Sequence, residues 1–204
     1  MAEVVKREVY YFPEPGEQNT GLVVEAVALR AMAGDIDTVV VASNRGATAA
    51  RFGHALKGRA TVICVTEAPS RREWGHAWPC LQDDYRHELA DLGVKIVEES
   101  PFVFHSTILD ASKWKVLPHE ELVRETLYTF GQGMKVAVEV VLMAVAAGIV
   151  APYRDVIGVG GTGTGADTAI VLRSTYPGTV FAEDVSKRLE VREILAMPLA
   201  KKWW

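Results

Sequence analysis

Two short runs of apolar, β-branched residues narrow the choice of fold for this chain. Residues 37–42 read Asp-Thr-Val-Val-Val-Ala and residues 61–66 read Thr-Val-Ile-Cys-Val-Thr. Strands that are buried on both faces carry such continuous apolar runs, and they occur mainly in parallel sheets. Helical patterns at about 20–33 and 49–56 alternate with the two runs. The first third of the chain therefore predicts an α/β fold with a mostly parallel sheet and helices on both faces.

The rest of the chain continues this alternation of strands and helices. Further strands are expected at 9–12, 94–97, 156–160, 168–173 and 191–197, and further helices at 83–92 and 119–130. The segment 134–147 is ambiguous, because Val136, Val138 and Val140 alternate as in a strand, but its length favours a buried helix. The length of 204 residues predicts a single domain over residues 1–204.

The composition excludes several classes of function. With 49% apolar residues the chain can bury a sizeable core without a metal or a disulfide, and Cys64 and Cys80 form no CxxC pair. A formal net charge of −4 gives no basic footprint for nucleic acid. The apolar run 136–150 contains Glu139 and is too short to span a bilayer, and residues 1–12 lack the apolar core of a signal peptide. We expect a cytoplasmic protein with no membrane or nucleic-acid partner.

The first loop that could carry chemistry lies between a predicted buried strand and a predicted helix, and reads Ser43-Asn44-Arg45-Gly46-Ala47-Thr48. Its small residues let backbone N–H groups approach a ligand, and the N-terminus of the following helix stabilises an anion. Ser43 and Thr48 add hydroxyl donors, and Arg45 adds a cation suited to phosphate. The alternative is an ordinary turn in which Thr48 caps the helix. The P-loop motif is absent.

The second loop is rich in glycine and threonine, and reads Gly160-Gly161-Thr162-Gly163-Thr164-Gly165-Ala166-Asp167-Thr168. Such a loop can form a nest of N–H groups for an anion. Gly158, Gly160 and Gly163 match GxGxxG, but strand-like residues follow them, which argues against a nicotinamide site. Asp167 is expected to bond its own backbone or to hold a ligand hydroxyl. The alternative is a flexible glycine hairpin without a ligand.

Four blocks of residues, spread through most of the chain, carry a resemblance to a known family. They are Phe12-x-x-Pro15-Gly16-x-x-Asn19-Thr20, Val41-Ala42-Ser43-x-x-Gly46-x-Thr48-Ala49, Phe130-Gly131-x-Gly133-x-Lys135-Val136-x-Val138-Glu139 with Met143-Ala144, and Gly160-Gly161-Thr162-x-x-Gly165-Ala166-Asp167-Thr168-Ala169. The chain resembles the C-terminal, effector-binding domain of pyruvate kinase. It is more similar still to a small, largely archaeal family of free-standing proteins that are like this domain.

The resemblance implies a three-layer αβα sandwich of the pyruvate kinase C-terminal type. It also implies a phosphorylated ligand between the two loops, with flavin mononucleotide (FMN) as the suggested cofactor. The residues expected to bind it are Ser43, Asn44, Arg45, Gly46, Thr48, Gly160, Gly161, Thr162, Gly163, Thr164, Gly165, Asp167 and Thr168. The sequence has no counterpart of the catalytic barrel of pyruvate kinase, so no kinase activity is implied.

Several charged residues outside the loops have two interpretations. Glu139 lies in an apolar segment, so it is expected to pair with Lys135 or Arg173, or to face the ligand. His105 is expected to be a surface or capping residue, and the arginines at 71–72 a solvated loop. No triad with a nucleophile elbow and no pair of histidines at metal spacing is present.

The tryptophans lie in two long irregular stretches and at the end of the chain. Trp74, Trp78 or Trp114 could stack on a flat ring such as flavin, or these residues could cover the core or form a subunit interface. Trp203 and Trp204 are exposed by position and suggest docking onto this chain or a neighbour. These features make a homo-oligomer one expected form of the protein.

Three functions are compatible with the sequence. The first is a module that binds a phosphorylated small molecule, FMN above all, for sensing or storage. The second is a flavin-dependent oxidoreductase, which needs an acid or base near the flavin, such as His105, His76 or Glu139. The third is a structural role with both loops empty, in which case changes at Arg45 or Gly161 would abolish no binding.

Overall fold

The computed structural model describes residues 4–105, 113 and 119–202. Trp114, Trp203 and Trp204 therefore lie outside the described residues. Within them, seven strands form one sheet in the order β1-β7-β6-β5-β2-β3-β4. The strands are β1 (Tyr10–Phe12), β2 (Thr38–Ala42), β3 (Thr61–Val65), β4 (Lys95–Val97), β5 (Asp155–Gly160), β6 (Thr168–Arg173) and β7 (Glu190–Pro198).

Most of the neighbouring strands run parallel, as predicted. The pairs β2–β3, β2–β5, β3–β4 and β1–β7 are parallel, and only β6 runs antiparallel to its two neighbours, β5 and β7. The chain returns directly from β5 into β6 as a hairpin, because no helix lies between them. The glycine-rich loop is thus a strand-loop-strand connection, and a dinucleotide-binding turn, which would open a helix, is not formed.

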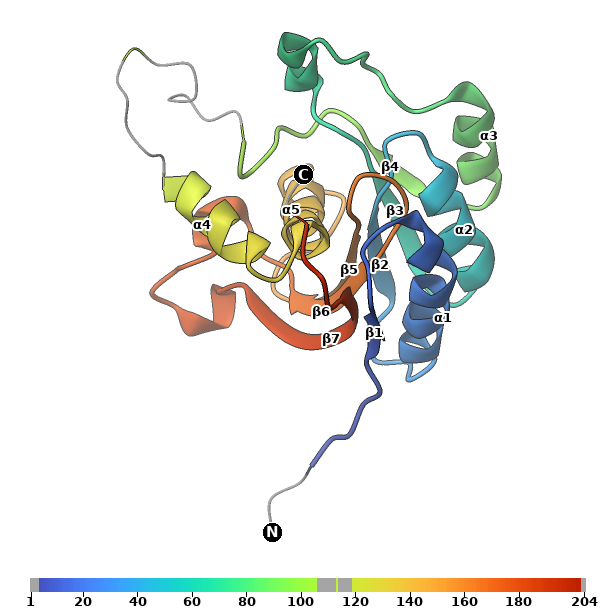
Figure 1. The fold of residues 1–204 in the computed structure, drawn as a ribbon, viewed down its shortest axis with the longest axis vertical. Helices are drawn as coiled ribbons and strands as arrows, with labels where there is room; N and C mark the ends of the chain where they lie inside the picture. Colours follow the sequence, from blue (N-terminus) through green and yellow to red (C-terminus); the bar gives the residue numbers. More distant parts are fainter. Residues whose placement is uncertain (1–3, 106–112, 114–118, 203–204) are drawn as a thin grey trace.

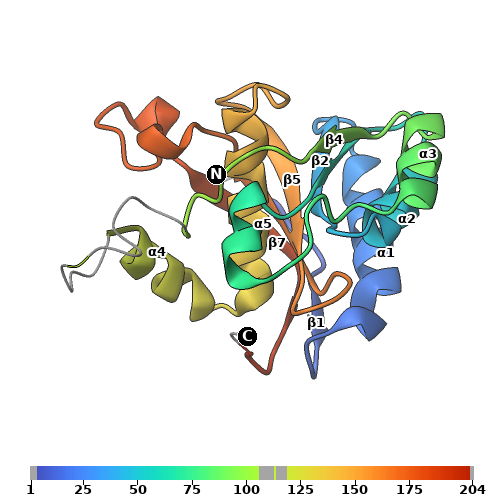
Figure 2. The same ribbon diagram turned by 90° about the horizontal axis from the view of Figure 1, so that it is seen from above.

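Helices cover both faces of the sheet (Figure 1). The helices are α1 (Thr20–Ala31), α2 (Ala47–Leu56), α3 (Asp83–Asp91), α4 (His119–Tyr128) and α5 (Gln132–Ala146). Val39 and Val41 of β2 pack with α1 and α2, whereas Val40 points to the other face and packs with α5. Figure 2 shows α1, α2 and α3 on one side of the sheet and α4 and α5 on the other. Because both faces are buried, the strand reads as one apolar run.

Helix α5 resolves the ambiguity of the segment with alternating valines. It spans 15 residues, and 12 of them are buried. A helix that is apolar all round must be buried between other elements, and α5 lies between the sheet and α4. No helix in the described ranges has the length and apolar character needed to cross a bilayer.

Several predicted boundaries differ from the observed ones by one or two residues. The last strand covers 190–198 instead of 191–197, since its charged residues form ion pairs at the sheet edge and do not end the strand. The irregular stretch at 67–82 contains a 3-10 helix, η2 (Pro69–Trp74), whose proline lies at its first position. Helix α2 begins at Ala47, two residues earlier than predicted.

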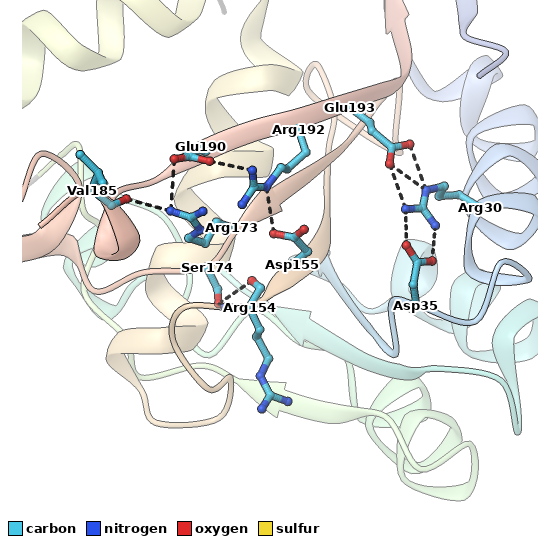
Figure 3. Close-up of polar contacts among 10 residues, drawn as sticks. All are labelled: Arg30, Asp35, Arg154, Asp155, Arg173, Ser174, Val185, Glu190, Arg192 and Glu193. Carbon is cyan, nitrogen blue, oxygen red and sulfur yellow. Dashed lines mark hydrogen bonds and ion pairs between the residues drawn. The ribbon is translucent and has the colours of Figure 1, made fainter. Parts of the chain in front are cut away.

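Several ion pairs lie along the edge of the sheet at which β2 and β5 begin (Figure 3). The guanidinium of Arg30, only 8% exposed, binds Asp35 through Nη1 at 2.6 Å and Glu193 through Nη2 at 2.9 Å. The hydrogen bonds to these two carboxylates raise the pKa of Arg30, and the Arg30 guanidinium lowers the pKa of Asp35 to about 2. The same edge carries the pairs Arg173–Glu190, Arg192–Glu190 and Arg192–Asp155.

Candidate functional site

The two glycine-containing loops meet at the opposite edge of the sheet. Strands β2, β3 and β5 are parallel, so their carboxyl ends lie together. From β2 the chain moves outward through β3 and β4, and it later returns to place β5 on the other side of β2. In open α/β sheets, ligands bind outside the carboxyl ends of the strands where the strand order reverses in this way. The loops that follow β2 and β5 flank this position.

A cavity of about 640 Å³ opens at this edge. Its volume lies within the range of roughly 300–1,000 Å³ that is usual for small-molecule sites. The two loops, η2, the ends of β2 and β3, and the first turns of α2 and α5 form its walls. Its location and size are those of a ligand site, and its chemistry follows from the side chains.

The first loop turns sharply into α2. Gly46 has φ +104°, and a Cβ atom there would lie 2.3 Å from Cβ of Tyr85, so only glycine fits. The hydroxyl oxygen of Ser43 accepts a hydrogen bond from the N–H of Ala49 at 3.1 Å. Ser43 therefore supplies the capping acceptor for α2. Thr48 lies inside the first turn of the helix and lines the cavity, which corrects its interpretation as the cap.

Arg45 is the charged residue that this loop presents to the cavity. It is exposed and has no ion-pair partner among residues 4–105, 113 and 119–202. The other charged lining residues pair with one another, Arg71 with Glu67 at 3.1 Å and Lys135 with Glu139 at 2.5 Å. The described wall therefore offers one uncompensated positive charge, which favours an anionic ligand.

A buried aspartate shapes the second loop. Asp167 is fully buried, and its Oδ2 accepts hydrogen bonds from the N–H groups of Gly16 at 3.0 Å and Thr162 at 3.1 Å. Its Oδ1 accepts from the hydroxyl of Thr168 at 2.8 Å. Asp167 thus ties the loop to the segment before α1, and this arrangement leaves it away from the cavity. Of the two predicted roles, the structure supports the backbone-bonding one.

Close backbone contacts fix the base of the second loop and leave its tip open. A Cβ at Gly161 would lie 2.3 Å from the carbonyl oxygen of Gly165, and one at Gly165 would lie 2.5 Å from Oγ1 of Thr20. A Cβ at Gly163 would meet nothing within 4 Å. The N–H of Ala166 also donates to Thr20 Oγ1 at 3.0 Å. Replacing Gly161 by valine would therefore distort the loop itself. Arg45→Ala changes a residue without such contacts and is the better test of binding.

The first turn of α5 packs directly against β5 and β6. A Cβ at Gly160 would lie 2.2 Å from the carbonyl oxygen of Gly133, and a Cβ at Gly133 would lie 2.2 Å from Oγ1 of Thr168. This approach brings Gln132 to the cavity wall. The side-chain oxygen of Gln132 is buried and has no hydrogen-bond partner within the described part of the chain. The site thus has a second helix N-terminus, which sequence analysis missed.

Eight of the thirteen residues predicted to bind the ligand line the cavity. They are Ser43, Asn44, Arg45, Thr48, Gly161, Gly163, Thr164 and Gly165. The other five are Gly46, Gly160, Thr162, Asp167 and Thr168, which lie behind the wall and hold the loops in place. Sequence motifs do not separate the two groups, because both need small or hydroxyl-bearing residues at a tight turn.

Two aromatic rings form the wall contributed by η2 and the segment after β4. Trp74 and Phe102 stack with an interplanar angle of 5° and ring centroids 6.1 Å apart. Both line the cavity, and the guanidinium of Arg71 lies 5.2 Å from the ring centroid of Trp74. Arg71 is half-buried and lines the cavity, which corrects the expectation of a solvated loop. His76 is exposed and lies outside this wall.

Three titratable side chains meet deeper in the same cavity. Lys135 and Glu139 are 4% and 3% exposed, and they are one turn apart on α5. His105 Nε2 lies 2.7 Å from Lys135 Nζ, and its Nδ1 lies 3.2 Å from Nη1 of Arg124 on α4. Glu139 therefore pairs with Lys135, as predicted, and also lines the cavity. His105 is half-buried and belongs to this cluster, which corrects its interpretation as a surface or capping residue.

The lining residues that sequence analysis missed include Glu67, Gln82, Tyr85, Tyr128 and Gln132. They come from four different segments of the chain, and neither spacing nor composition sets them apart. For Lys135 the sequence does contain a signal, which is a lysine and a glutamate four residues apart in an otherwise apolar helix. Once the helix is buried, the two charges must be paired with each other or with a ligand.

Comparison of the sequence with models of known protein families matches none of them. Within the described ranges, no three histidine, cysteine or acidic residues gather as a metal-ligand group. The chemistry of the cavity is thus argued from its own residues.

Proposed function

We propose that this chain is a cytoplasmic module that binds a phosphorylated small molecule in the cavity at the carboxyl edge of its sheet. The observation that carries the proposal is the meeting of two loops, 43–48 and 161–165, at the point where the strand order reverses. The phosphate would lie between these loops. Its oxygens would accept hydrogen bonds from the side chains of Ser43, Thr48 and Thr164 and from loop N–H groups.

Electrostatics favour an anion at this position. The first turns of α2 and α5 both reach the cavity, and each helix N-terminus carries roughly half a positive charge. Arg45 adds a full positive charge that no described carboxylate neutralises. Because Ser43 accepts from Ala49, its own hydroxyl proton is available to a ligand oxygen.

FMN is the ligand that we propose for this site. Its phosphate would bind between the loops, and its flat ring would contact the stacked pair Trp74 and Phe102. The volume of about 640 Å³ leaves room for a ring system beside the phosphate. We further propose that the fold is of the pyruvate kinase C-terminal type. In that type of domain the bound ligand is an effector, so the protein would sense or store its ligand.

A second candidate function is a flavin-dependent oxidoreductase. It is favoured by one observation, which is that His105 and Glu139 both line the cavity and are linked through Lys135. Either could move a proton at a bound substrate. The exposed position of His76 removes it from this role. A storage or sensing protein would bind FMN equally well after His105→Asn, whereas an oxidoreductase would lose turnover.

Titration with FMN and with riboflavin, which lacks the phosphate, tests the proposal. We expect saturable FMN binding, seen as a change in flavin absorption, and much weaker riboflavin binding. Arg45→Ala should weaken FMN binding about tenfold, because a hydrogen bond to a charged group contributes about 1.5 kcal/mol. The free energy of unfolding should change by less than about 0.5 kcal/mol, because Arg45 is exposed.

Arg59→Ala is the matched control, since Arg59 is exposed and precedes β3 at the opposite edge of the sheet. It should leave FMN binding unchanged. Equal affinity for FMN and riboflavin would contradict a phosphate site between the loops. Phosphate-dependent binding that both arginine variants retain would place the site elsewhere on the molecule.

A further inference from the structure

The deep end of the cavity holds a lysine in an unusual setting. Lys135 Nζ lies 2.5 Å from Oε2 of Glu139 and 2.7 Å from Nε2 of His105, and the lysine is 4% exposed. Glu139 Oε1 accepts hydrogen bonds from the N–H groups of Val103 at 3.2 Å and Phe104 at 2.9 Å. Both oxygens of Glu139 thus act as acceptors, as in a carboxylate.

The contacts of His105 bear on the protonation state of Lys135. Arg124 carries only donors, so the contact of its Nη1 with His105 Nδ1 at 3.2 Å is a hydrogen bond only when Nδ1 is the unprotonated ring nitrogen. A neutral imidazole that accepts at Nδ1 carries its proton on Nε2, and that nitrogen faces Lys135 Nζ. With that tautomer Lys135 Nζ accepts from His105, which an ammonium group cannot do. Both contacts of His105 are therefore hydrogen bonds together only when Lys135 is a neutral amine, which then donates to Glu139.

The charges around Lys135 support this assignment. Burial lowers the pKa of Lys135, and the nearby Glu139 opposes that effect. The cations Arg124 of α4 and Arg71 of η2 lower the pKa further. Tyr128 of α4 also lines this wall. With His105 from the segment after β4, these residues are the titratable groups around the amine among residues 4–105, 113 and 119–202.

We propose that Lys135 is a carbonyl-capturing residue, and that the molecule bound in the cavity is a phosphorylated aldehyde or ketone that forms an imine with Nζ. This inference rests on the phosphate site of the proposed function but does not require flavin. Lys135 lines the same cavity as the two loops, so the amine and the loops face one ligand space. Buried, neutral lysines are the amines that proteins use for imine formation.

The step balances with the groups present. The Nζ lone pair attacks the carbonyl carbon, and the π electrons move to the oxygen, which accepts a hydrogen bond from His105 Nε2–H. Glu139 takes a proton from the nitrogen and passes it to the oxygen, which gives a carbinolamine. A second proton follows the same route, the C–O bond breaks, water leaves, and a C=N bond remains. The net change is one amine and one carbonyl to one imine and one water.

Reductive trapping tests the inference on the full chain. The probe is D-glyceraldehyde 3-phosphate with sodium cyanoborohydride, whose hydride converts an imine into a stable secondary amine. Intact-mass and peptide mass spectrometry should find one adduct, on Lys135, formed at least tenfold faster than with glyceraldehyde. Arg45→Ala should remove this preference for the phosphorylated probe, and FMN should slow the reaction by competition.

Matched variants separate chemistry from folding. Lys135→Arg keeps a hydrogen-bond donor beside Glu139 but cannot form an imine, so it should lose the adduct while circular dichroism shows a folded protein. Lys57→Met removes an exposed lysine and should change nothing. The pKa of Lys135 is lowered by burial, so its labelling rate should rise less steeply with pH above neutrality than that of an ordinary lysine, which with a pKa of about 10.4 gains tenfold per pH unit there.

The outcomes distinguish this inference from the proposed function. An unmodified Lys135 in a protein that binds FMN through its phosphate would overturn the inference alone. An adduct on Lys135 that forms equally fast without a phosphate, and in Arg45→Ala, would overturn the phosphate site and with it the proposed class of ligand. Slow labelling spread over exposed lysines would also overturn the inference.

Discussion

The two edges of the sheet use charge in opposite ways. At the edge where β2 and β5 begin, Arg30 lies between the carboxylates of Asp35 and Glu193, and its guanidinium is saturated by them (Figure 3). At the edge where these strands end, Arg45 lacks a described ion-pair partner and Lys135 faces a histidine nitrogen. In the first arrangement the charges neutralise one another, whereas in the second we propose that a ligand neutralises Arg45.

The difference separates the charges that stabilise the fold from those that we propose act in binding. A saturated guanidinium, with the pKa of Arg30 raised and that of Asp35 lowered by the same contact, stabilises the folded chain and has nothing left for a ligand. Arg45 has no ion-pair partner in the described part of the chain and lies beside helix N-termini, and we propose that it serves binding. The following predictions test this division.

The largest effect on stability is expected from the glycine contacts behind the cavity. Gly160→Ala would place a Cβ 2.2 Å from the backbone oxygen of Gly133 and 2.7 Å from the nitrogen of Ala137, and neither backbone atom can move freely. We expect a loss of about 3 kcal/mol in the free energy of unfolding. Gly163→Ala is the matched control at the open tip of the loop, with a cost of about 1 kcal/mol from its φ of +77°. Urea unfolding measures both.

A similar cost for the two alanine variants would contradict the close approach of α5 to β5. In that case packing would not hold Gln132 and Lys135 at the cavity wall. Their positions would then depend on ion pairs and hydrogen bonds, as the positions of the charged residues at the opposite edge do.

The next effect is expected at the saturated edge. Arg30→Ala would leave Glu193 and Asp35 without their shared cation, and we expect a loss of about 2 kcal/mol, less than for a fully buried pair because both carboxylates reach solvent. FMN binding should not change. Lys187→Ala breaks an exposed pair with Asp184 and should cost less than about 0.5 kcal/mol. Loss of FMN affinity in a folded Arg30→Ala protein would show that the two edges are not independent.

The smallest effect is the acid dependence of the saturated edge. The pKa of Asp35 is lowered from 3.8 to about 2 in the folded chain, so its stabilising contribution is complete above pH about 4 and is lost as the pH falls through about 2. Since 58% of the side chain is exposed, we expect this contribution to be below about 1 kcal/mol. Unfolding measured between pH 5 and pH 2 should show a shallower loss of stability in Asp35→Asn than in the unchanged chain. An identical pH profile in both proteins would contradict the pairing of Asp35 with Arg30.

The sequence predicted the fold well for those elements whose type and position are determined by burial alone. The apolar runs of β2 and β3 and the length of α5 follow from burial on both faces, and Gly46 and Gly34 mark turns that only glycine makes readily. The placement of β7 between β6, to which it is antiparallel, and β1, to which it is parallel, depends on long-range pairing, which no local pattern encodes.

The candidate site was predicted in part for the same reason. Local motifs identified the two loops, since tight turns next to strands need glycine and hydroxyl-bearing residues. They could not show that Asp167 lies behind the wall, or that Arg71 and His105 join it from distant segments. Tertiary contacts decide these positions, and the apolar flanks of Lys135 and Glu139 were the one local sign of a buried charged cluster.

The central claim is that the carboxyl edge of the sheet binds the phosphate of a small molecule, and a crystal structure of the protein with FMN tests it most directly. The account predicts the phosphate between residues 43–48 and 161–165, with Arg45 in contact and the loops unmoved. A phosphate bound elsewhere, or an empty cavity in crystals grown at saturating FMN, would contradict it.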